Sequence, residues 1–217
     1  MNAGKSLIES LQKHQLMVAV RTETPEDAYR AATACVEGGI RFIEITFSVR
    51  GADEVIRRLS ADKRVTVGAG TILSILDARK ALKAGASYLV SPSFDEEVVK
   101  FAKKEGVISI PGACTPTEIY RAHKAGADII KLFPFIEIGG LGFLKAVRGP
   151  LPFVRYMLCG GANLDNVSKY LSADAAGILI GSAIIRRDLV AVKDWSAIAG
   201  LAGSFVRKVE DFARTKV

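Results

Sequence analysis

Histidine and cysteine are scarce in this sequence of 217 residues, which contains two histidines and three cysteines. Cys35, Cys114 and Cys159 are an odd number without a CxxC spacing, so we expect neither a disulfide framework nor a cysteine zinc site. His14 and His123 both lie in segments predicted to be helical, which disfavours a metal-dependent epimerase. We therefore expect no metal and no cofactor. Reduced thiols fit the cytosol.

Long apolar runs are absent too. No run of about 18 or more apolar residues could span a bilayer. The start, MNAGKSLIESLQKHQ, lacks the apolar stretch of a signal peptide. These features predict a soluble, cytoplasmic protein without a membrane partner. No linker or low-complexity tract divides the sequence, so we expect one domain over residues 1–217, because barrels of roughly 200–250 residues commonly form single domains.

The chain has no segment in which charged residues of only one sign are gathered. The formal net charge is +7, but the lysines and arginines are spread over predicted helical faces and are mixed with acids. A protein that binds nucleic acid usually gathers its basic residues in a patch or stripe. We therefore expect no nucleic-acid partner, and an anionic small-molecule substrate suits the charge better.

What recurs along the chain is a short run of β-branched and apolar residues. Eight such runs occur, namely MVAVR, FIEITF, VTVGAG, YLVSP, VISIPG, IIKLF, VRYMLCGG and GILIGSA. They begin about 19–25 residues apart, which leaves room for a strand, a helix and two short loops in each unit. The pattern predicts an α/β protein with a (β/α)8 TIM barrel and an N-terminal helix. An open doubly wound sheet usually has fewer strands and a GxGxxG turn, which GAGT does not match.

Capping residues predict where the intervening helices begin and end. TPED at Thr24, SFDE at Ser93 and TPTE at Thr115 each place a Ser or Thr three residues before an acid, as N-caps do. Two of these sites also have a proline at the first helical position. Glycines are predicted to end three helices just before the next strand, at Gly85, Gly106 and Gly126.

Two ionisable side chains lie within the predicted strands, Glu44 of FIEIT and Lys131 of IIKLF. Side chains alternate between the two faces of a strand. If the isoleucines beside Glu44 meet the helices, then Glu44 points into the barrel, and Lys131 does so likewise between Ile130 and Leu132. In a barrel of this kind, chemistry takes place where strands end and the loops to the helices begin.

The pair has two interpretations. Glu44 and Lys131 could form a structural ion pair, since buried acids and bases are usually paired. Alternatively, a hydrophobic enclosure disfavours an ammonium ion and leaves a neutral amine that can attack a carbonyl. A nearby carboxylate has the opposite effect, because it stabilises the ammonium ion. The role of a proton carrier therefore suits Glu44 better than that of a permanent ion-pair partner. This interpretation favours carbon–carbon bond chemistry, because an iminium accepts the electrons released as a bond breaks.

Glycine-rich turns follow the last two predicted strands, in CGGANLDN and GSAI. Exposed backbone amides at such turns bind anions, and the loops after strands seven and eight are a recurrent phosphate site in barrels. Gly160, Gly161 and Ser182 are therefore candidate phosphate ligands. The alternative is that Gly160, Gly161 and Gly181 merely permit tight turns.

Taken in order, EITF, GAGT, SP, IPG…TPTE, IKLFP, GGANLDN and GSA resemble the 2-keto-3-deoxy-6-phosphogluconate (KDPG) and 4-hydroxy-2-oxoglutarate (KHG) aldolase family. The resemblance runs through nearly the whole chain, and its motifs fall at the ends of successive strands. It implies a barrel fold, a metal-independent Schiff-base aldolase and a homotrimer.

The resemblance also implies roles for individual residues. Lys131 would be the Schiff-base lysine, Glu44 the general acid and base, and Thr71 a ligand of the pyruvate carboxylate. The remaining contacts with a phosphorylated keto-deoxy acid would come from Pro92 and Phe133 in the pocket wall and from Gly160, Gly161 and Ser182 around the phosphate.

Two positions depart from the family pattern. Many members have an arginine where this chain has Ser48, and a threonine where it has Cys159. Because that arginine would contact a substrate carboxylate, Arg21 at the end of the first strand becomes the expected anion partner, with Arg50 as second choice. Cys159 is expected to be a small packing residue with weaker hydrogen bonding to phosphate.

The expected reaction is cleavage of a 2-keto-3-deoxy sugar acid to pyruvate and an aldehyde. The main candidate substrate is 2-keto-3-deoxy-6-phosphogluconate, which gives glyceraldehyde 3-phosphate; 4-hydroxy-2-oxoglutarate, which gives glyoxylate, is a further one. The alternatives are a 2-keto-3-deoxy-6-phosphogalactonate aldolase, a phosphate-binding barrel of the indole-glycerol-phosphate synthase kind without a covalent adduct, and a non-catalytic sugar-phosphate-binding barrel.

Overall fold

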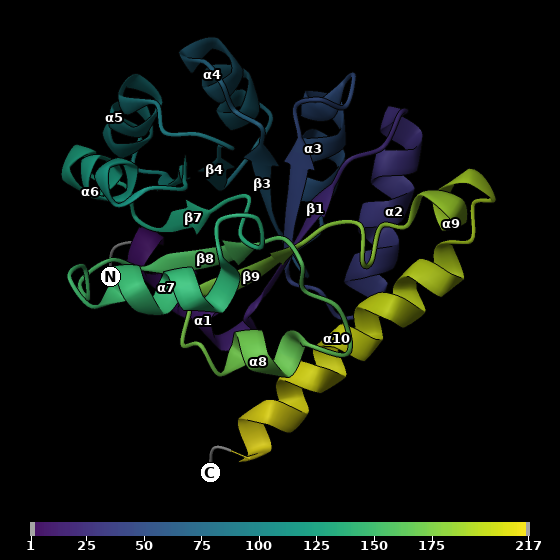
Figure 1. Cartoon of the computed structure of the whole chain (residues 1–217). Coiled ribbons are helices and arrows are strands. Elements are labelled where there is room, and N and C mark those ends of the chain that lie inside the picture. Colours follow the sequence, from purple (N-terminus) through teal and green to yellow (C-terminus); the bar gives the residue numbers. More distant parts are fainter. Residues whose placement is uncertain (1–2, 216–217) are drawn as a thin grey trace.

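Strands and helices alternate along the chain in the computed structural model, which describes residues 3–215 (Figure 1). The strands of this part are β1 (Leu16–Val20), β2 (Phe42–Thr46), β3 (Thr66–Gly70), β4 (Tyr88–Val90), β5 (Ile108–Ile110), β6 (Gly112–Ala113), β7 (Ile130–Leu132), β8 (Tyr156–Cys159) and β9 (Gly177–Ile180). The helices are α1 (Ala3–His14), α2 (Pro25–Glu37), α3 (Ala52–Ser60), α4 (Ile75–Lys83), α5 (Glu96–Lys104), α6 (Pro116–Ala125), α7 (Gly140–Arg148), α8 (Val167–Leu171), α9 (Arg187–Ala191) and α10 (Trp195–Thr215).

The strands form one parallel sheet in the order β5-β4-β3-β2-β1-β9-β8-β7-β6. Its two end strands, β5 and β6, are a single stretch of chain interrupted by Pro111, which has no backbone N–H to donate. The Pro111 carbonyl still accepts a hydrogen bond from the Lys131 backbone at 2.9 Å. The sheet is therefore a nearly closed barrel, as predicted, with the fifth predicted strand divided into two.

The predicted helix boundaries are right with one exception. The Thr24 side chain caps α2, and Thr115 forms a capping box with Glu118 at the start of α6. The prediction of Ser93 as a cap is wrong, because α5 begins at Glu96 and is capped by Asp95. The Asp95 carboxylate immediately precedes the helix and accepts from two of its free N–H groups, which Ser93 is too far upstream to do. The three helix-ending glycines all have positive φ angles, at Gly85, Gly106 and Gly126.

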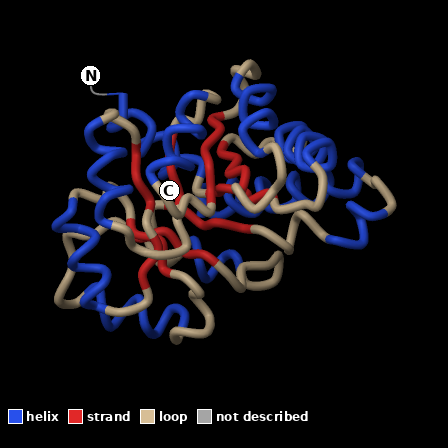
Figure 2. Tube along the Cα trace, turned by 90° about the horizontal axis from the view of Figure 1, so that it is seen from above, coloured by secondary structure: helices blue, strands red, loops and turns tan. Residues whose placement is uncertain are grey.

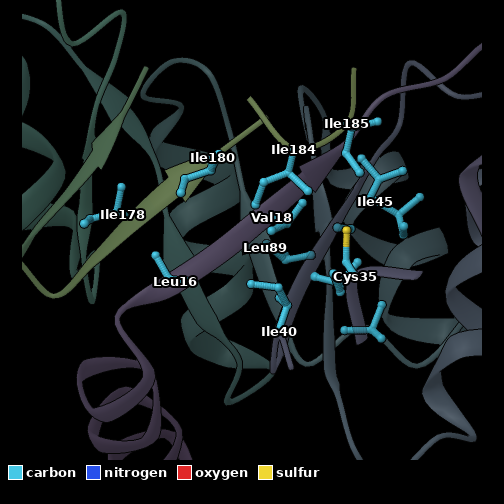
Figure 3. Packing of buried hydrophobic residues seen from close by; sticks show 14 of the residues in the cluster. Leu16, Val18, Cys35, Ile40, Ile45, Leu89, Ile178, Ile180, Ile184 and Ile185 are labelled. Carbon is cyan, nitrogen blue, oxygen red and sulfur yellow. The ribbon is translucent and has the colours of Figure 1, made fainter. Parts of the chain in front are cut away.

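Helices surround the strands on the outside, as the view from above shows (Figure 2). Side chains on the outer faces of the strands, among them Leu16, Val18, Ile45 and Ile178, pack with Cys35 of α2 in one continuous apolar cluster (Figure 3). This cluster accounts for every second residue of most strands. The intervening residues point into the barrel, which confirms the alternation predicted for β2 and β7.

The barrel interior is filled by a second apolar cluster, whose buried residues include Met17, Phe42, Tyr88 and Met157. The N-terminal helix α1 contributes Leu11 to the same cluster at the end of the barrel where the strands begin. The interior of the barrel is thus packed with side chains at that end.

The C-terminal helix α10 runs along the outside of the barrel beside α2 and α8 (Figure 1). Gly38, just after α2, allows the close approach, because a Cβ atom there would overlap the backbone carbonyl of Ala199. Among the described residues, 3–215, no helix is both long and apolar enough to cross a membrane.

Two glycines on the inner face of β3 provide space that neighbouring side chains occupy. A Cβ atom at Gly68 would overlap the ring of Tyr88, and one at Gly70 would overlap the carboxyl group of Glu44. Tyr88 cannot easily move aside, because it is fully buried and its hydroxyl donates to the Ile43 carbonyl at 2.7 Å. Glycine is required at both positions by the packing of the barrel interior.

We expect Gly68→Ala to lower the free energy of unfolding by about 1–3 kcal/mol, the usual effect of overpacking a core. Gly200→Ala is the matched control, because its added Cβ on the exposed side of α10 meets nothing within 4 Å. The control should be neutral or stabilising by up to about 1 kcal/mol, since alanine favours helix. Denaturant unfolding of both variants measures this, and a Gly68→Ala protein as stable as the parent would contradict it.

Candidate active site

A cavity of about 350 Å³ opens at the carboxyl ends of the strands. Because α1 and the interior cluster fill the other end of the barrel, this cavity has a closed floor. Every site residue predicted from the sequence lines it, namely Arg21, Glu44, Thr71, Pro92, Lys131, Phe133, Gly160, Gly161 and Ser182. The structure thus brings together residues that lie in or follow seven different strands. Their roles in binding or catalysis stay predictions.

Glu44 and Lys131 lie at the floor of the cavity and are almost completely buried, with 2% and 6% of their surfaces exposed. Lys131 extends from β7, whose backbone is held at this residue by the carbonyl of Pro111. Its Nζ atom lies 4.9 Å from the centre of the Phe133 ring. The amine is therefore held beside apolar surface but remains at the edge of the cavity, where a small molecule can reach it.

The carboxyl group of Glu44 holds its proton more tightly than an exposed glutamate. Burial raises its pKa, against the opposing positive charges of Lys131 and Arg21. Its Oε2 atom is buried and has no hydrogen-bond partner within residues 3–215. Leaving a buried oxygen without a partner is unfavourable, and it suits a group whose partner arrives with a ligand. Glu44 is thus equipped to give and take a proton.

Thr71 has an unusual backbone conformation at the cavity wall. Its φ angle is +57°, in the left-handed region that a β-branched residue rarely adopts. The next residue is held firmly, because the Ile72 N–H donates to Val90 at 3.1 Å and the Ser91 hydroxyl donates to the Ile72 carbonyl at 2.7 Å. Strain of this kind is retained mainly where it serves a function, which supports a binding role for Thr71.

The turn after β8 exposes backbone N–H groups to the cavity. Gly160 and Gly161 both have positive φ angles, of 115° and 77°. Their carbonyls are occupied, because the Tyr170 hydroxyl donates to Gly160 at 3.0 Å and the Asn166 amide donates to Gly161 at 2.8 Å. The N–H groups of Gly161 and Ala162, by contrast, donate no hydrogen bond within the described chain.

The turn after β9 has the same property. The backbone N–H groups of Ser182 and Ala183 have no acceptor among residues 3–215, and both residues line the cavity. Two adjacent strands therefore present free N–H donors to one side of the cavity. Such a set of donors is suited to an anion such as phosphate.

Ser48 and Cys159, the two residues that depart from the family pattern, differ in their relation to the cavity. Ser48 and Arg50 do not line the cavity, and the Ser48 hydroxyl is 2.9 Å from the Oγ1 atom of Thr46. Arg21, directly after β1, does line it and is close enough to lower the pKa values of Glu44 and Cys159. Of the two arginines considered as anion partners, only Arg21 is therefore in position.

Cys159 lies at the end of β8 and lines the cavity. Burial raises the pKa of its thiol to about 11, against the opposing charges of Lys131 and Arg21. A thiol with that pKa stays protonated near neutral pH and is a poor nucleophile. The structure supports the prediction that Cys159 packs rather than reacts.

The described part of the chain contains no group of three or more His, Cys, Asp or Glu side chains that could hold a metal ion. Its two histidines lie in α1 and α6, as predicted. One charged residue of the cavity was missed by the sequence analysis, namely Arg187 at the start of α9. Its position in RRD, shortly after GSA, was the available signal.

Comparison with known proteins gives consistent matches over nearly the whole chain. A family model described as KDPG and KHG aldolase matches residues 7–201. A 2-dehydro-3-deoxy-phosphogluconate aldolase of Treponema pallidum is 35% identical over 200 residues, which cover 91% of this chain and 94% of that protein.

Solved structures agree with the sequence matches. The KDPG aldolase of Legionella pneumophila, with pyruvate captured at low pH as a covalent carbinolamine intermediate, superimposes with a TM-score of 0.83 at 27% identity, covering 91% of this chain and 97% of that one. The KDPG aldolase of Zymomonas mobilis ZM4 with 3-phosphoglycerate has a TM-score of 0.81 at 28% identity, covering 91% and 93%.

The raised pKa of Glu44 predicts how stability depends on pH. Because the folded pKa lies above the unfolded value, the contribution of Glu44 to stability is present below the ordinary carboxyl pKa of 4.5 and is lost as pH rises through the folded pKa. Glutamine has no proton to lose at this position. We therefore expect Glu44→Gln to gain stability relative to the parent as the pH is raised from about 4 to about 8.

Denaturant unfolding of the two proteins at a series of pH values measures the difference. The slope of this difference in unfolding free energy against pH reports the proton that Glu44 binds on folding. A difference that is constant with pH, or that moves in favour of the parent, would show that Glu44 ionises at least as easily in the folded protein as in the unfolded chain.

Proposed function

The chain belongs to the KDPG and KHG aldolase family, and from this premise we propose that it is a metal-independent Schiff-base aldolase. Its substrate is a 2-keto-3-deoxy sugar acid, with 2-keto-3-deoxy-6-phosphogluconate the first candidate. The observation that carries the proposal is the burial of one amine and one carboxyl, Lys131 and Glu44, at the floor of a single cavity whose walls present anion-binding groups.

In the proposed mechanism, the neutral amine of Lys131 attacks the C2 keto group and forms a carbinolamine. Protonated Glu44 gives its proton to the departing hydroxyl, water leaves and an iminium forms. The resulting Glu44 carboxylate takes the proton of the C4 hydroxyl. The C3–C4 bond breaks, its electrons move to the iminium nitrogen as an enamine, and the aldehyde departs.

The second half of the reaction restores the enzyme. Glu44 returns its proton to C3 of the enamine, which becomes the iminium of pyruvate. Water then hydrolyses the iminium to pyruvate and the free amine of Lys131, and the Glu44 carboxylate takes up the proton that this hydrolysis releases. The raised pKa of Glu44 supports these transfers, because a carboxyl that holds its proton more tightly can be protonated when a proton must be given and still accept one afterwards.

We propose that the two ends of the substrate bind on different walls. The pyruvate carboxylate would contact Thr71 and Arg21, and the phosphate would accept hydrogen bonds from the turns at Gly160, Gly161 and Ser182. The free N–H groups of those turns support the second assignment. The pyruvate carbinolamine of the Legionella relative supports the covalent chemistry, and the Zymomonas relative with 3-phosphoglycerate supports a phosphorylated substrate.

Other substrates and roles make different predictions. The shorter 4-hydroxy-2-oxoglutarate and 2-keto-3-deoxy-6-phosphogalactonate would use the same lysine, and a substrate panel separates them. A lyase or synthase of the non-covalent kind would form no adduct, and a non-catalytic barrel would release no pyruvate. The family resemblance further supports a homotrimer, a single domain over residues 1–217 and a cytoplasmic location.

Reductive trapping tests the covalent step. An iminium is reduced by borohydride to a stable amine, so pyruvate and borohydride together should attach one three-carbon unit to Lys131 and inactivate the protein. Mass spectrometry of the intact protein and peptide mapping measure this. Lys131→Arg should abolish the label, because a guanidinium stays protonated and cannot attack a carbonyl. A label on another lysine, or none in the parent, would refute the assignment.

The replacement Cys159→Thr tests the phosphate wall. A threonine hydroxyl beside the Gly160–Gly161 turn adds a hydrogen bond to phosphate, worth about 0.5–1.5 kcal/mol, or roughly two- to twelve-fold. We expect kcat/KM to rise by that factor for a 6-phosphorylated keto-deoxy acid and to stay the same for its unphosphorylated form. Equal kcat/KM for both substrates in the parent, with no response to the substitution, would favour 4-hydroxy-2-oxoglutarate instead.

A further inference from the structure

Arg187 is held in a fixed place at the rim of the cavity. It follows the turn after β9 and is the first residue of α9. Between the two, Ile184 and Ile185 are buried in the outer apolar cluster beside Val18 and Ile45 (Figure 3). Their backbone N–H groups also donate to a single carbonyl, that of Gly181, at 3.0 and 2.9 Å. The segment that carries Arg187 is therefore anchored by packing and by hydrogen bonds.

The guanidinium of Arg187 has no partner of its own. Within the described residues it forms no hydrogen bond and no ion pair, although Asp188 is adjacent in sequence. That carboxylate is bound instead by Arg186, the arginine on the other side, which lines neither of the two cavities that Arg187 borders. Of two consecutive arginines, the one facing the cavity is thus the one free to bind an anion. A guanidinium offers a planar fork of donors that matches phosphate.

The two arginines of the cavity, Arg21 and Arg187, are both exposed residues. Arg21 is close enough to Glu44 and Cys159 to lower the pKa of each. Arg187 also lines a neighbouring cavity of about 530 Å³, which shares only Arg21, Ile185 and Arg187 with the first. Both arginines therefore border the two cavities, and Arg21 is the one that acts on the buried carboxyl of Glu44.

Three of the four charged side chains that line the catalytic cavity have a role in the proposed reaction, and one does not. Its charged residues in the described chain are Arg21, Glu44, Lys131 and Arg187. Under the proposed function, Lys131 is covalently engaged, Glu44 carries the proton, and Arg21 attracts the pyruvate carboxylate. A substrate with a second anionic group at its far end has only Arg187 as a counter-charge.

We propose that Arg187 is a specificity-determining residue that selects aldehydes ending in a dianionic group. It supplies the positive charge, and the N–H groups after β8 and β9 supply hydrogen bonds, to the same end of the substrate. This inference rests on the proposed aldolase function, because it concerns the aldehyde half of that reaction. Arg187 touches no reacting atom, so its effect falls on the choice of aldehyde and not on pyruvate chemistry at Lys131.

The test is the condensation of pyruvate with a matched pair of aldehydes, glyceraldehyde 3-phosphate and glyceraldehyde. We expect Arg187→Gln to lower kcat/KM for the phosphorylated aldehyde by about tenfold or more, as expected for the loss of a charge-assisted hydrogen bond. The value for glyceraldehyde should stay within about twofold of the parent, a change smaller than one hydrogen bond would cause. Borohydride trapping of pyruvate should be unchanged, which also shows that the variant is folded.

Two further variants separate charge from structure. Arg186→Gln removes the neighbouring arginine, which the structure pairs with Asp188, and it should leave the preference between the two aldehydes unaltered. Arg187→Lys keeps the charge but not the fork, and it should recover part of the preference. The preference of the parent should also weaken as salt is raised from about 0.01 to about 0.5 M, because this exposed charge is screened, and Arg187→Gln should lose that salt dependence.

The outcomes distinguish this inference from the proposed function. If the parent traps no pyruvate and condenses neither aldehyde, the aldolase proposal itself fails. If the parent condenses both aldehydes and Arg187→Gln keeps its preference for the phosphorylated one, the role of Arg187 is overturned while the aldolase stands. An equal loss of the preference in Arg186→Gln and Arg187→Gln would likewise overturn it, because the effect would then belong to the whole loop.

Discussion

The structure depends on one constraint: a carboxyl and an amine are buried together at the top of an otherwise apolar barrel interior. Burying ionisable groups is unfavourable unless they find partners or change their protonation. Glu44 responds by holding its proton more tightly, and one of its oxygens has no hydrogen bond within the described residues. Beneath the pair, the interior cluster and Leu11 of α1 fill the barrel. The cavity that the pair lines is at the carboxyl ends of the strands, where the turns at Gly160, Gly161 and Ser182 also lie.

The space for this pair comes from a neighbouring strand that has glycine at two successive positions of its inner face. Gly68 and Gly70 of β3 leave room for Tyr88 on β4 and Glu44 on β2. The alternation of Glu44 with apolar residues was visible in the sequence, because period-two patterning is local. The reason for GAG in β3 was not visible, since it lies in the side chains of two other strands. The two glycines of this strand are thus a packing requirement.

The same division between local and long-range information explains what the sequence predicted and what it missed. Short patterns were enough to predict the strand positions, most helix caps and the candidate site residues. The structure has the predicted fold, and these site residues line one cavity. The division of the fifth strand follows from Pro111, whose missing N–H matters only once a partner strand is known. Arg187 was missed for a similar reason. It is adjacent to Arg186 and chemically identical to it, and only the orientation of the chain after β9 decides which of the two lines the cavity.

The departures at Ser48 and Cys159 are best understood from the geometry of the barrel. The ends of all its strands border one cavity, so a binding group lost from one strand can be replaced by a residue that follows another. Arg21 after β1 borders the same region as the end of β2, its immediate neighbour in the sheet, and is the arginine that acts on Glu44. Arg187 after β9 borders the turn after β8, the next strand on the other side. The positive charge around the cavity is therefore supplied by the ring of strand ends as a whole, which can retain that charge while the individual positions that supply it change.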